Sequence, residues 1–204
     1  MKRTDTRRRL LNLAETHLMQ HGYHGFSFRD LARTLEIKPA AVHYHFRTKP
    51  DLVVAAIHRY GQRFDAWTAL VADRSPSDQL LAYVALGQAV VHDGRTCALG
   101  MLQAELATLP EAVRTAVLAV YARFLHFYTT QLTAARARGS AEFALPPAVA
   151  AELLGCTLVG AQHLARSMGE QAYRRVMQAQ TAQLGLTGPW PHPPQPPRLE
   201  PVAP

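Results

Sequence analysis

Cysteine is scarce in this sequence, and the two that occur lie far apart. Cys97 and Cys156 show no CxxC spacing. A disulfide framework or a zinc site requires more cysteines, or cysteine and histidine at short fixed spacings. We therefore expect two free thiols and no metal site.

Long apolar runs are also missing. No stretch of about 18 consecutive apolar residues occurs, and the N-terminus has no basic segment followed by an apolar one. These absences argue against a membrane span and against export. We expect a cytoplasmic protein.

Recognisable catalytic motifs are absent too. The sequence contains neither an HExxH motif nor a glycine-rich phosphate loop. Of its ten histidines, three lie in or beside the first predicted helix and the turn after it, namely His17, His21 and His24, and three are scattered singly, namely His92, His126 and His163. We expect a protein that is not an enzyme and that carries no cofactor.

What the sequence does have is positive charge concentrated at one end. Residues 1–63 contain 12 Lys and Arg against 5 Asp and Glu, whereas the remainder contains 10 of each sign. A concentrated positive charge suits a polyanion, because neutralised phosphates release their counterions. The alternative is an ordinary solvated basic face.

Apolar spacing and capping residues predict an all-α protein of about nine helices. Ser27 followed by Asp30 is typical of a capping box, and Thr48 precedes a proline near a helix start. No segment alternates with period two for long enough to indicate a strand. The predicted helices are 7–21, 27–35, 39–45, 48–72, 76–92, 97–108, 110–138, 146–166 and 169–185.

Two of these helices have the layout of a helix-turn-helix. The segments 27–35 and 39–45 are short and joined by a tight turn, and in such a motif the second helix enters the major groove. Pro39, Ala40 and Ala41 leave the start of that helix without bulk, so its backbone can approach base edges. A purely architectural DNA binder is the alternative, and the neutral, aromatic-rich remainder argues against it.

The segment from Arg9 to Leu52 closely resembles the N-terminal head of the TetR family of transcriptional regulators. The resemblance rests on Gly22-Tyr23, on Phe28 to Leu31 with Ala32, and above all on the run from His43 to Leu52, HYHFRTKPDL. This run matches the family's aromatic-aromatic-His-Phe-x-Ser/Thr-Lys-x-x-Leu signature. The family resemblance implies a three-helix head and a C-terminal helical bundle that binds a ligand and dimerises.

The resemblance also implies which residues contact DNA, with Lys49 as the phosphate-binding lysine. The implied set is Arg29, Pro39, Ala40, Ala41, His43, Tyr44, His45 and Lys49, and we also expect Lys38, next to Pro39, to contact DNA. Structural alternatives exist for four of them. His45 could pack between helices, Tyr44 could be a surface aromatic, Lys49 could be a solvated lysine, and Arg29 could pair with Asp30 or Glu36.

Two positions depart from the family pattern. Glu36 stands where glycine is common in the turn, and a left-handed backbone there would cost a non-glycine residue on the order of 1 kcal/mol. His43 stands where tyrosine is commoner, which leaves the contact made by this position open. Val42, Phe46 and Ile37, with Leu31, are expected in the core of the head.

We expect three regions along the chain. Residues 1–50 form the DNA-binding head, a linking helix runs over 48–72, residues 51–188 form the ligand-binding and dimerisation body, and 189–204 is a proline-rich disordered tail. Small-molecule sites mix aromatic and polar residues. The expected lining residues are Trp67, Tyr83, His92, Cys97, Met101, Tyr121, Phe124, Phe127, Tyr128, Gln162 and His163.

Cys97 begins the run Cys97-Ala98-Leu99-Gly100-Met101-Leu102, which is similar to a pattern in a TetR branch that includes sensors of reactive compounds. A thiolate at a helix N-terminus is stabilised by the helix dipole. Cys97 is therefore either a sensor of electrophiles or oxidants, or an inert small apolar residue.

The last two long helices are expected to form a two-fold symmetric dimer. Their apolar residues, with two glycines that permit close approach, are Leu153, Leu154, Gly155, Leu158, Val159, Gly160, Leu164, Met168, Val176 and Leu184. A dimer places two recognition helices on DNA and predicts a palindromic operator. The sequence thus predicts a DNA-binding repressor that a small organic effector releases, or alternatively a thiol-based repressor acting through Cys97.

Overall fold

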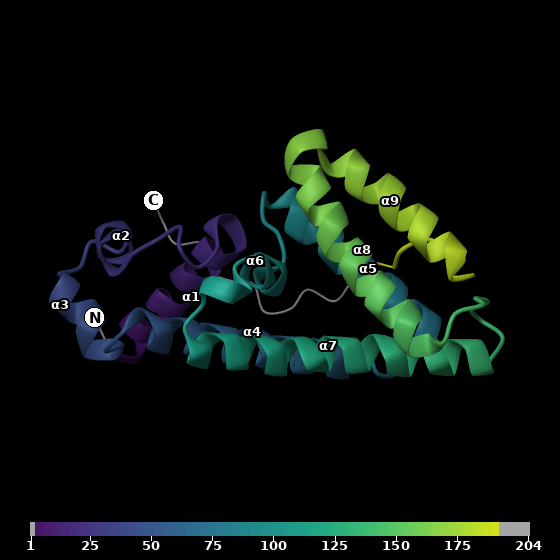
Figure 1. Ribbon diagram of the computed structural model, residues 1–204, viewed down its shortest axis with the longest axis horizontal. Coiled ribbons are helices and arrows are strands. Elements are labelled where there is room, and N and C mark those ends of the chain that lie inside the picture. Colours follow the sequence, from purple (N-terminus) through teal and green to yellow (C-terminus); the bar gives the residue numbers. More distant parts are fainter. Residues whose placement is uncertain (1–2, 192–204) are drawn as a thin grey trace. The chain divides into compact units, whose positions relative to one another are not determined.

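The computed structural model describes residues 3–191, and this part of the chain is entirely helical (Figure 1). The all-α prediction with about nine helices is confirmed for these residues. The helices are α1 (Arg3–His21), α2 (Phe28–Thr34), α3 (Pro39–His45), α4 (Lys49–Leu70), α5 (Pro76–His92), α6 (Ala98–Ala104), the 3₁₀ turn η1 (Leu106–Thr108), α7 (Glu111–Ala137), α8 (Pro147–Met168) and α9 (Glu170–Gln183).

The predicted capping residues set the helix starts. Ser27 and Asp30 form a reciprocal capping box at the start of α2, with the Ser27 N–H donating to Asp30 Oδ2 at 2.9 Å. Thr48 and Asp51 form a second capping box at the start of α4. The Thr48 N–H donates to Asp51 Oδ2, and the Asp51 N–H donates to Thr48 Oγ1. Gly22, with φ of 73°, ends α1 as a left-handed residue.

One predicted helix is wrong in its second half. The segment predicted as a helix over 97–108 ends as α6 at Ala104 and continues only as the 3₁₀ turn η1. The Glu105 N–H bonds to the Leu102 carbonyl three residues back, and the Thr108 hydroxyl donates to the Glu105 carbonyl. These i→i−3 bonds replace the α-helical ladder, which periodicity alone does not reveal.

The chain divides into two compact units. The first comprises residues 3–63 together with 98–120, so α6 and the start of α7 cluster with the three head helices. Its core residues are fully buried and include Leu10, Leu18, Leu31, Val42, Leu52 and Ile57. Residues 51–63 and 98–120 therefore pack with the head, although the sequence assigned them to the body.

A buried ion network fixes α1 against α4 in this first unit. The Glu15 side chain is 1 % exposed, and its two carboxylate oxygens bind Arg59, at 2.6 Å, and Arg63. Arg59 also donates to Asn12 Oδ1 at 2.7 Å. Because a buried carboxylate is costly unless paired and hydrogen-bonded, this network fixes the position of α4 on the head.

The second unit comprises residues 64–97 and 121–191. In it α8 and α9 form a helical hairpin, turning at Gly169, that packs on α5 (Figure 1). By length and composition α8 would also suit a membrane span, although the core helices of soluble proteins pass the same test. Trp190 packs edge-on against Tyr173 at 6.3 Å, while residues 192–204 of the predicted disordered tail lie outside the described residues.

Candidate nucleic-acid interface and effector body

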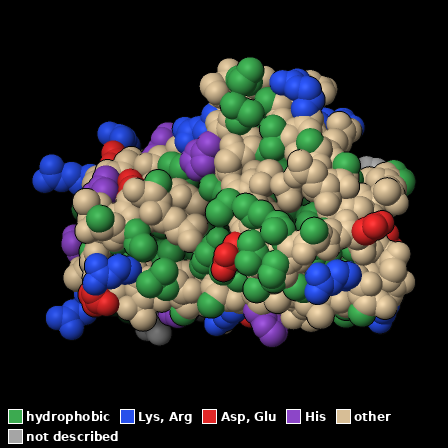
Figure 2. Space-filling model, turned by 45° about the vertical axis from the view of Figure 1, so that its right-hand side comes forward, with side chains coloured by type: hydrophobic (Ala, Val, Ile, Leu, Met, Phe, Trp, Pro, Cys, Tyr) green, Lys and Arg blue, Asp and Glu red, His purple; other side chains and the backbone are tan. Residues whose placement is uncertain are grey.

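The α2–α3 pair presents a mostly polar, exposed face with apolar residues behind it. Val42 and Phe46 are buried and Ile37 is partly buried, as expected for core residues of the head. The residues predicted to contact DNA are accessible: Arg29, Lys38, Pro39, Ala40, His43 and Tyr44 are exposed, and Ala41, His45 and Lys49 are partly exposed. Figure 2 shows Lys, Arg and His side chains projecting from the surface of this head, at the left of the view.

Arg29 is available for an external partner. Its alternative partner Asp30 binds Arg33 instead, with Nη2 to Oδ1 at 2.7 Å, and hydrogen bonds from Ser27 hold the pKa of Asp30 below its usual value. Within the described residues Arg29 itself forms no ion pair. The exposed Arg29 side chain on α2 is thus a cation that the described residues do not pair.

The rings of α3 are oriented by local contacts. His43 packs edge-on to Phe28 at 5.0 Å, and its Nδ1 lies 3.3 Å from the Arg47 carbonyl, which can only accept. Nδ1 therefore carries the proton, and in the neutral ring Nε2 is an acceptor. Tyr44 is 67 % exposed beside His45, so its ring and hydroxyl face solvent.

Glu36 does adopt the left-handed conformation considered from the sequence. Its φ is 53°, and it is the one non-glycine residue among those described with a positive φ. Glu36 N donates to Arg33 O and Ile37 N to Ala32 O, which closes the turn between α2 and α3. The turn keeps its geometry without glycine, at the cost of local backbone strain.

Lys49 turns inward. Its ammonium donates to the carbonyls of Tyr23, at 2.5 Å, and Phe26, and lies 4.2 Å from the Phe26 ring centroid. Burial lowers the pKa of Lys49, an effect that Glu105 and Asp30 partly oppose. Two of its three N–H donors stabilise the turn between α1 and α2, so the predicted phosphate contact would have to use the third.

The same turn is bound from the other side by Glu105, a role that the sequence did not indicate. Its carboxylate accepts the Tyr23 N–H at 2.6 Å, and His24 Nε2 lies 2.9 Å from the Thr108 hydroxyl. A side chain on Gly22 would meet the Glu105 carboxylate at 2.7 Å. These residues are about 80 positions apart in sequence, so no local pattern could have found the contact.

In the second unit, aromatic side chains from α4, α5 and α7 pack into one cluster, which we call the aromatic cluster. Phe64 and Phe124 stack at 3.8 Å, and Trp67 meets Tyr83 edge-on at 5.4 Å. The structure thus brings together five of the predicted ligand-lining residues with a sixth ring that was not predicted. The members are Phe64, Trp67, Tyr83, Phe124, Phe127 and Tyr128.

Polar groups lie at one side of this cluster. Gln162 is buried and its Oε1 accepts the Cys97 N–H at 2.7 Å. Burial and the neighbouring Cys97 raise the pKa of Tyr83, and burial raises that of Tyr173, whose hydroxyl donates to the Val84 carbonyl. The predicted residues Cys97 and Gln162 therefore contact each other.

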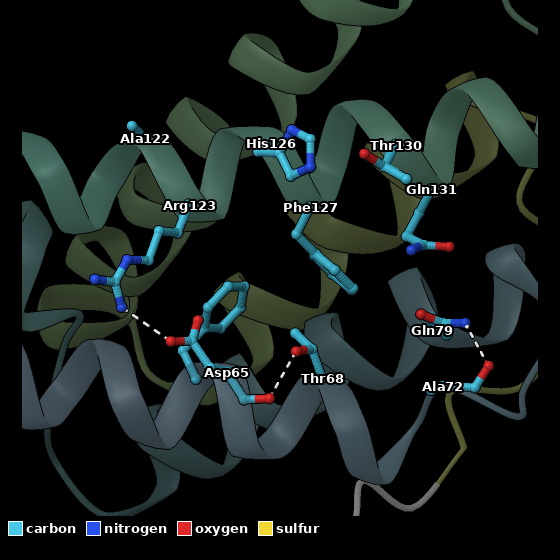
Figure 3. A pocket seen from close by; sticks show the side chains of 11 residues that line it. Asp65, Thr68, Ala72, Gln79, Ala122, Arg123, His126, Phe127, Thr130 and Gln131 are labelled. Atoms are coloured by element: carbon cyan, nitrogen blue, oxygen red, sulfur yellow. Dashed lines mark hydrogen bonds and ion pairs between the residues drawn. The ribbon is translucent and has the colours of Figure 1, made fainter.

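A groove of about 660 Å³ runs between α4, the start of α5 and α7 (Figure 3). Its floor contains Phe64 and Phe127, and Figure 3 shows Phe127 pointing from α7 toward the opposite helix. Asp65 and Arg123 pair across it at 2.9 Å. The remaining lining residues are Thr68, Ala72, Gln79, Ala122, His126, Thr130 and Gln131.

Besides Cys97 and Gln162, four predicted lining residues are not members of the aromatic cluster. His92 is exposed and pairs with Glu170 at 3.1 Å, because the last turn of α5 faces α9 there. Met101 lies on α6 in the first unit. The Tyr121 hydroxyl lies near Gly155 on α8. His163, also on α8, is partly buried, and this burial lowers its pKa. The contact with Glu170 thus holds His92 at the surface, and the role of Met101 stays a prediction.

The outer face of α8 carries an apolar stripe with no cover among the described residues. Its members recur every three or four positions and are Val149, Leu153, Cys156, Gly160, Leu164 and Met168. A side chain on Gly160 would meet nothing within 4 Å. Apolar side chains lie open at the top of Figure 2, where α8 and α9 meet.

Four residues predicted for the dimer face lie within the subunit. Leu154, Leu158 and Leu184 are buried in the chain's own core, and Gly155 faces Tyr121 and Tyr128. They occupy the inner face of α8 and the end of α9. Apolar periodicity marks both faces of such a helix and cannot say which one the subunit itself covers.

Comparison with known proteins gives consistent matches over both units. The family model for bacterial regulatory proteins of the tetR family matches residues 10–56, and the model for the tetracyclin repressor-like C-terminal domain matches residues 76–180. The HTH-type transcriptional repressor DhaR of Mycobacterium sp. (strain GP1) is 25 % identical over 166 residues, which cover 79 % of this chain and 82 % of that protein.

Three solved structures are similar in fold. A TetR-family regulator from Agrobacterium tumefaciens has a TM-score of 0.86 and 26 % identity, covering 90 % of this chain and 99 % of its own. The reduced form of E. coli NemR has a TM-score of 0.73, 23 % identity and coverage of 88 % and 97 %. A transcriptional regulator from Saccharomonospora viridis in complex with choline has a TM-score of 0.69 and 20 % identity, and the match covers 86 % of this chain and 95 % of that one.

Proposed function

Because this chain belongs to the TetR family of bacterial regulatory proteins, we propose that it is a repressor that binds a palindromic operator as a dimer and is released by a small organic effector. A relative, DhaR, is a transcriptional repressor. Regulators of this family are generally not enzymes, and we assign no catalytic activity to the chain.

The single observation that carries the proposal is the exposed face of α2 and α3. Arg29 has no ion pair within the described residues, and the exposed Tyr44 ring and the oriented His43 lie on the next helix. Donors and acceptors on a helix of this kind read base edges, while cations bind phosphates. The outer residues Lys38, Pro39, Ala40, Ala41, His45 and Lys49 complete the proposed interface.

The second unit supports the effector part of the proposal. An aromatic cluster beside the Cys97–Gln162 pair is the mixture of apolar and polar groups that small-molecule sites use. The Saccharomonospora viridis structure contains choline, so a regulator of similar fold does bind a small molecule. An effector that binds one conformation of the body better than another shifts the population of DNA-binding dimers.

The uncovered stripe on α8 supports the dimer. Met168 is 60 % exposed, and the open space at Gly160 leaves room for the backbone of a second helix. Two copies of the α8–α9 hairpin related by a two-fold axis would bury the stripe as a four-helix bundle. The operator would then share that two-fold symmetry.

The thiol-based alternative has less support. Cys97 precedes α6, which has only seven residues, and its N–H is bound to the Gln162 side chain. Cys156, the other cysteine, lies on the outer face of α8. Sensing through Cys97 stays a hypothesis.

Selection of bound duplexes from a random DNA library with the purified full chain tests the function. We expect enrichment of one palindrome whose half-sites are about one or more helical turns apart. Equal retention of all duplexes at moderate salt would reject sequence-specific binding. A palindrome-bound protein that sediments as a monomer would reject the dimer.

A further inference from the structure

Trp67 carries the one polar atom of the aromatic cluster that has no hydrogen-bond partner. Its side chain is 1 % exposed, and its indole Nε1 is buried without an acceptor among the described residues. Buried N–H groups are nearly always paired, and leaving one unpaired is costly. An unpaired donor at this place points to an acceptor that is supplied from outside the chain.

We propose that the effector is an uncharged aromatic compound with a hydrogen-bond acceptor, and that the Trp67 indole N–H is the donor that recognises it. The inference rests on the proposed effector-responsive function and adds the chemical class of the ligand. Trp67 is then a specificity-determining residue of the body.

The surroundings of Trp67 favour an aromatic ligand. Its ring lies 5.4 Å from the Tyr83 ring centroid, 6.0 Å from that of Phe127 and 6.5 Å from that of Phe64. Rings at these distances pack edge-on or stacked, and an additional ring can take the same arrangement. The apolar part of the ligand would thus replace contacts that the cluster already makes with itself.

The surroundings disfavour a charged ligand. The buried polar side chains of the second unit, within the described residues, are the uncharged Ser77, Gln79, Thr96, Gln162 and Thr181. Burial keeps the Tyr83 hydroxyl protonated by raising its pKa. An ion entering the cluster would lose its hydration without gaining a buried counter-charge.

A cation could still be attracted by aromatic faces, but these faces are occupied. Phe64 and Phe124 stack on each other at 3.8 Å with an interplanar angle of 13°, and Phe64 also meets Tyr83 and Phe127 edge-on. A cation binds the face of a ring, and an indole N–H presents its positive end to a ligand. The cluster therefore fits a neutral acceptor better than a quaternary ammonium.

The groove in Figure 3 borders the rings that surround this donor. Phe64 and Phe127 form its floor and are also ring neighbours of Trp67. At the rim, Asp65 and Arg123 neutralise each other. A ligand that enters this groove therefore meets two ring neighbours of Trp67 and an ion pair that is already neutralised.

Three simple probes of similar size test the ligand class. Acetophenone has a ring and a carbonyl acceptor, ethylbenzene has the ring alone, and phenyltrimethylammonium has the ring and a positive charge. Calorimetric titration of the full-length wild-type protein should show acetophenone binding about tenfold more tightly than ethylbenzene, the effect of one hydrogen bond. Phenyltrimethylammonium should bind more weakly than either.

Trp67→Phe removes the donor and keeps an aromatic ring. We expect it to weaken acetophenone binding about tenfold, to the level of ethylbenzene, and to leave ethylbenzene binding unchanged. Trp190→Phe is the matched control, because Trp190 is the only other tryptophan and packs on Tyr173. This control should bind all three probes as the wild type does.

A measurement on Trp190→Phe covers the case in which Trp67→Phe does not fold. This variant has a single indole N–H, and in the ¹H–¹⁵N spectrum its proton should move downfield with acetophenone but not with ethylbenzene. Equal binding of acetophenone and ethylbenzene, tighter binding of the ammonium, or no binding of any probe would overturn the inference. Acetophenone that binds through Trp67 without weakening DNA binding would instead contradict the proposed release by an effector.

Discussion

The Glu105 carboxylate accepts a 2.6 Å hydrogen bond from the Tyr23 backbone N–H, which joins the residue after α6 to the turn between α1 and α2. Lys49 binds the carbonyl of the same residue from α4. The turn that begins the helix-turn-helix is therefore held by an anion that follows α6 and a cation at the start of α4. A displacement of α6 would act on this turn directly.

Replacement of Glu105 by glutamine should loosen this turn. A hydrogen bond to a charged acceptor contributes about 1.5–3 kcal/mol when buried, and we expect about 1 kcal/mol here because Glu105 is partly exposed. Thermal unfolding should show a decrease of about 2–4 °C, and amide exchange at Tyr23 should accelerate. Glu152→Gln, on the exposed surface of α8, is the control. An unchanged exchange rate at Tyr23 would refute the role of Glu105.

Arg29→Ala should weaken operator binding and reduce the slope of log affinity against log salt by about one, as expected for one lost phosphate contact. Arg29 is a cleaner probe than Lys49, because Lys49→Ala would also remove the bonds to Tyr23 and Phe26. Fluorescence anisotropy over a salt series measures the slope. Arg138→Ala, an exposed site after α7, should leave it unchanged. An identical slope in both variants would remove Arg29 from the interface.

Gly160→Glu should dissociate the dimer without unfolding the subunit. A side chain at Gly160 meets nothing within 4 Å in the described part of its own chain, but a charge there would lie in the centre of the proposed interface. Sedimentation velocity at micromolar concentration should change from dimer to monomer with little change in Tm. Gly155→Leu should instead lower Tm, because the Cβ of the new side chain would lie 3.3 Å from the Tyr121 hydroxyl inside the subunit. A wild-type protein that is already monomeric would contradict the interface.

Cys97→Ser tests the thiol-based alternative. If Cys97 is a sensor, N-ethylmaleimide should release operator DNA from the wild type and from Cys156→Ser, but not from Cys97→Ser, because only the Cys97 thiolate would carry the response. Electrophoretic mobility shift with the selected operator measures release. Release that persists in Cys97→Ser rejects the sensor.

His17 should make the head less stable as pH falls. Its ring stacks on Phe26 at 5.2 Å, both ring nitrogens are buried without a partner in residues 3–191, and burial lowers its pKa below 6.5. In the unfolded chain the ring takes up a proton near pH 6.5, so below that value the unfolded state binds more protons and stability is lost. Above pH 6.5 the effect vanishes.

A pH series of thermal unfolding checks this prediction. The Tm of His17→Phe should fall less steeply between pH 7 and 5.5 than that of the wild type. His58→Gln, at an exposed histidine of α4, should follow the wild type. Parallel curves for all three proteins would show that His17 does not titrate differently in the folded head.

Local chemistry made much of the fold predictable. The capping pairs Ser27–Asp30 and Thr48–Asp51 act within three residues, and the apolar stripes follow the helical period. The left-handed backbone of Glu36 could also be considered from the sequence, because a tight turn between two helices restricts the φ of one residue. Five of the six aromatic residues of the cluster were identified because they interrupt otherwise aliphatic helices, and Phe64 was missed.

Long-range packing decided the rest. The sequence by itself determined the nine helices of residues 3–191, a basic head and the residues on the outer face of α3, because caps, periodicity and charge act over short distances. Only the tertiary structure decided that Lys49 points inward, that Glu105 binds a turn 82 residues away, and that Trp67 has no acceptor among the described residues. Partners far apart in sequence meet only when helices pack, and packing determines which polar groups remain unpaired.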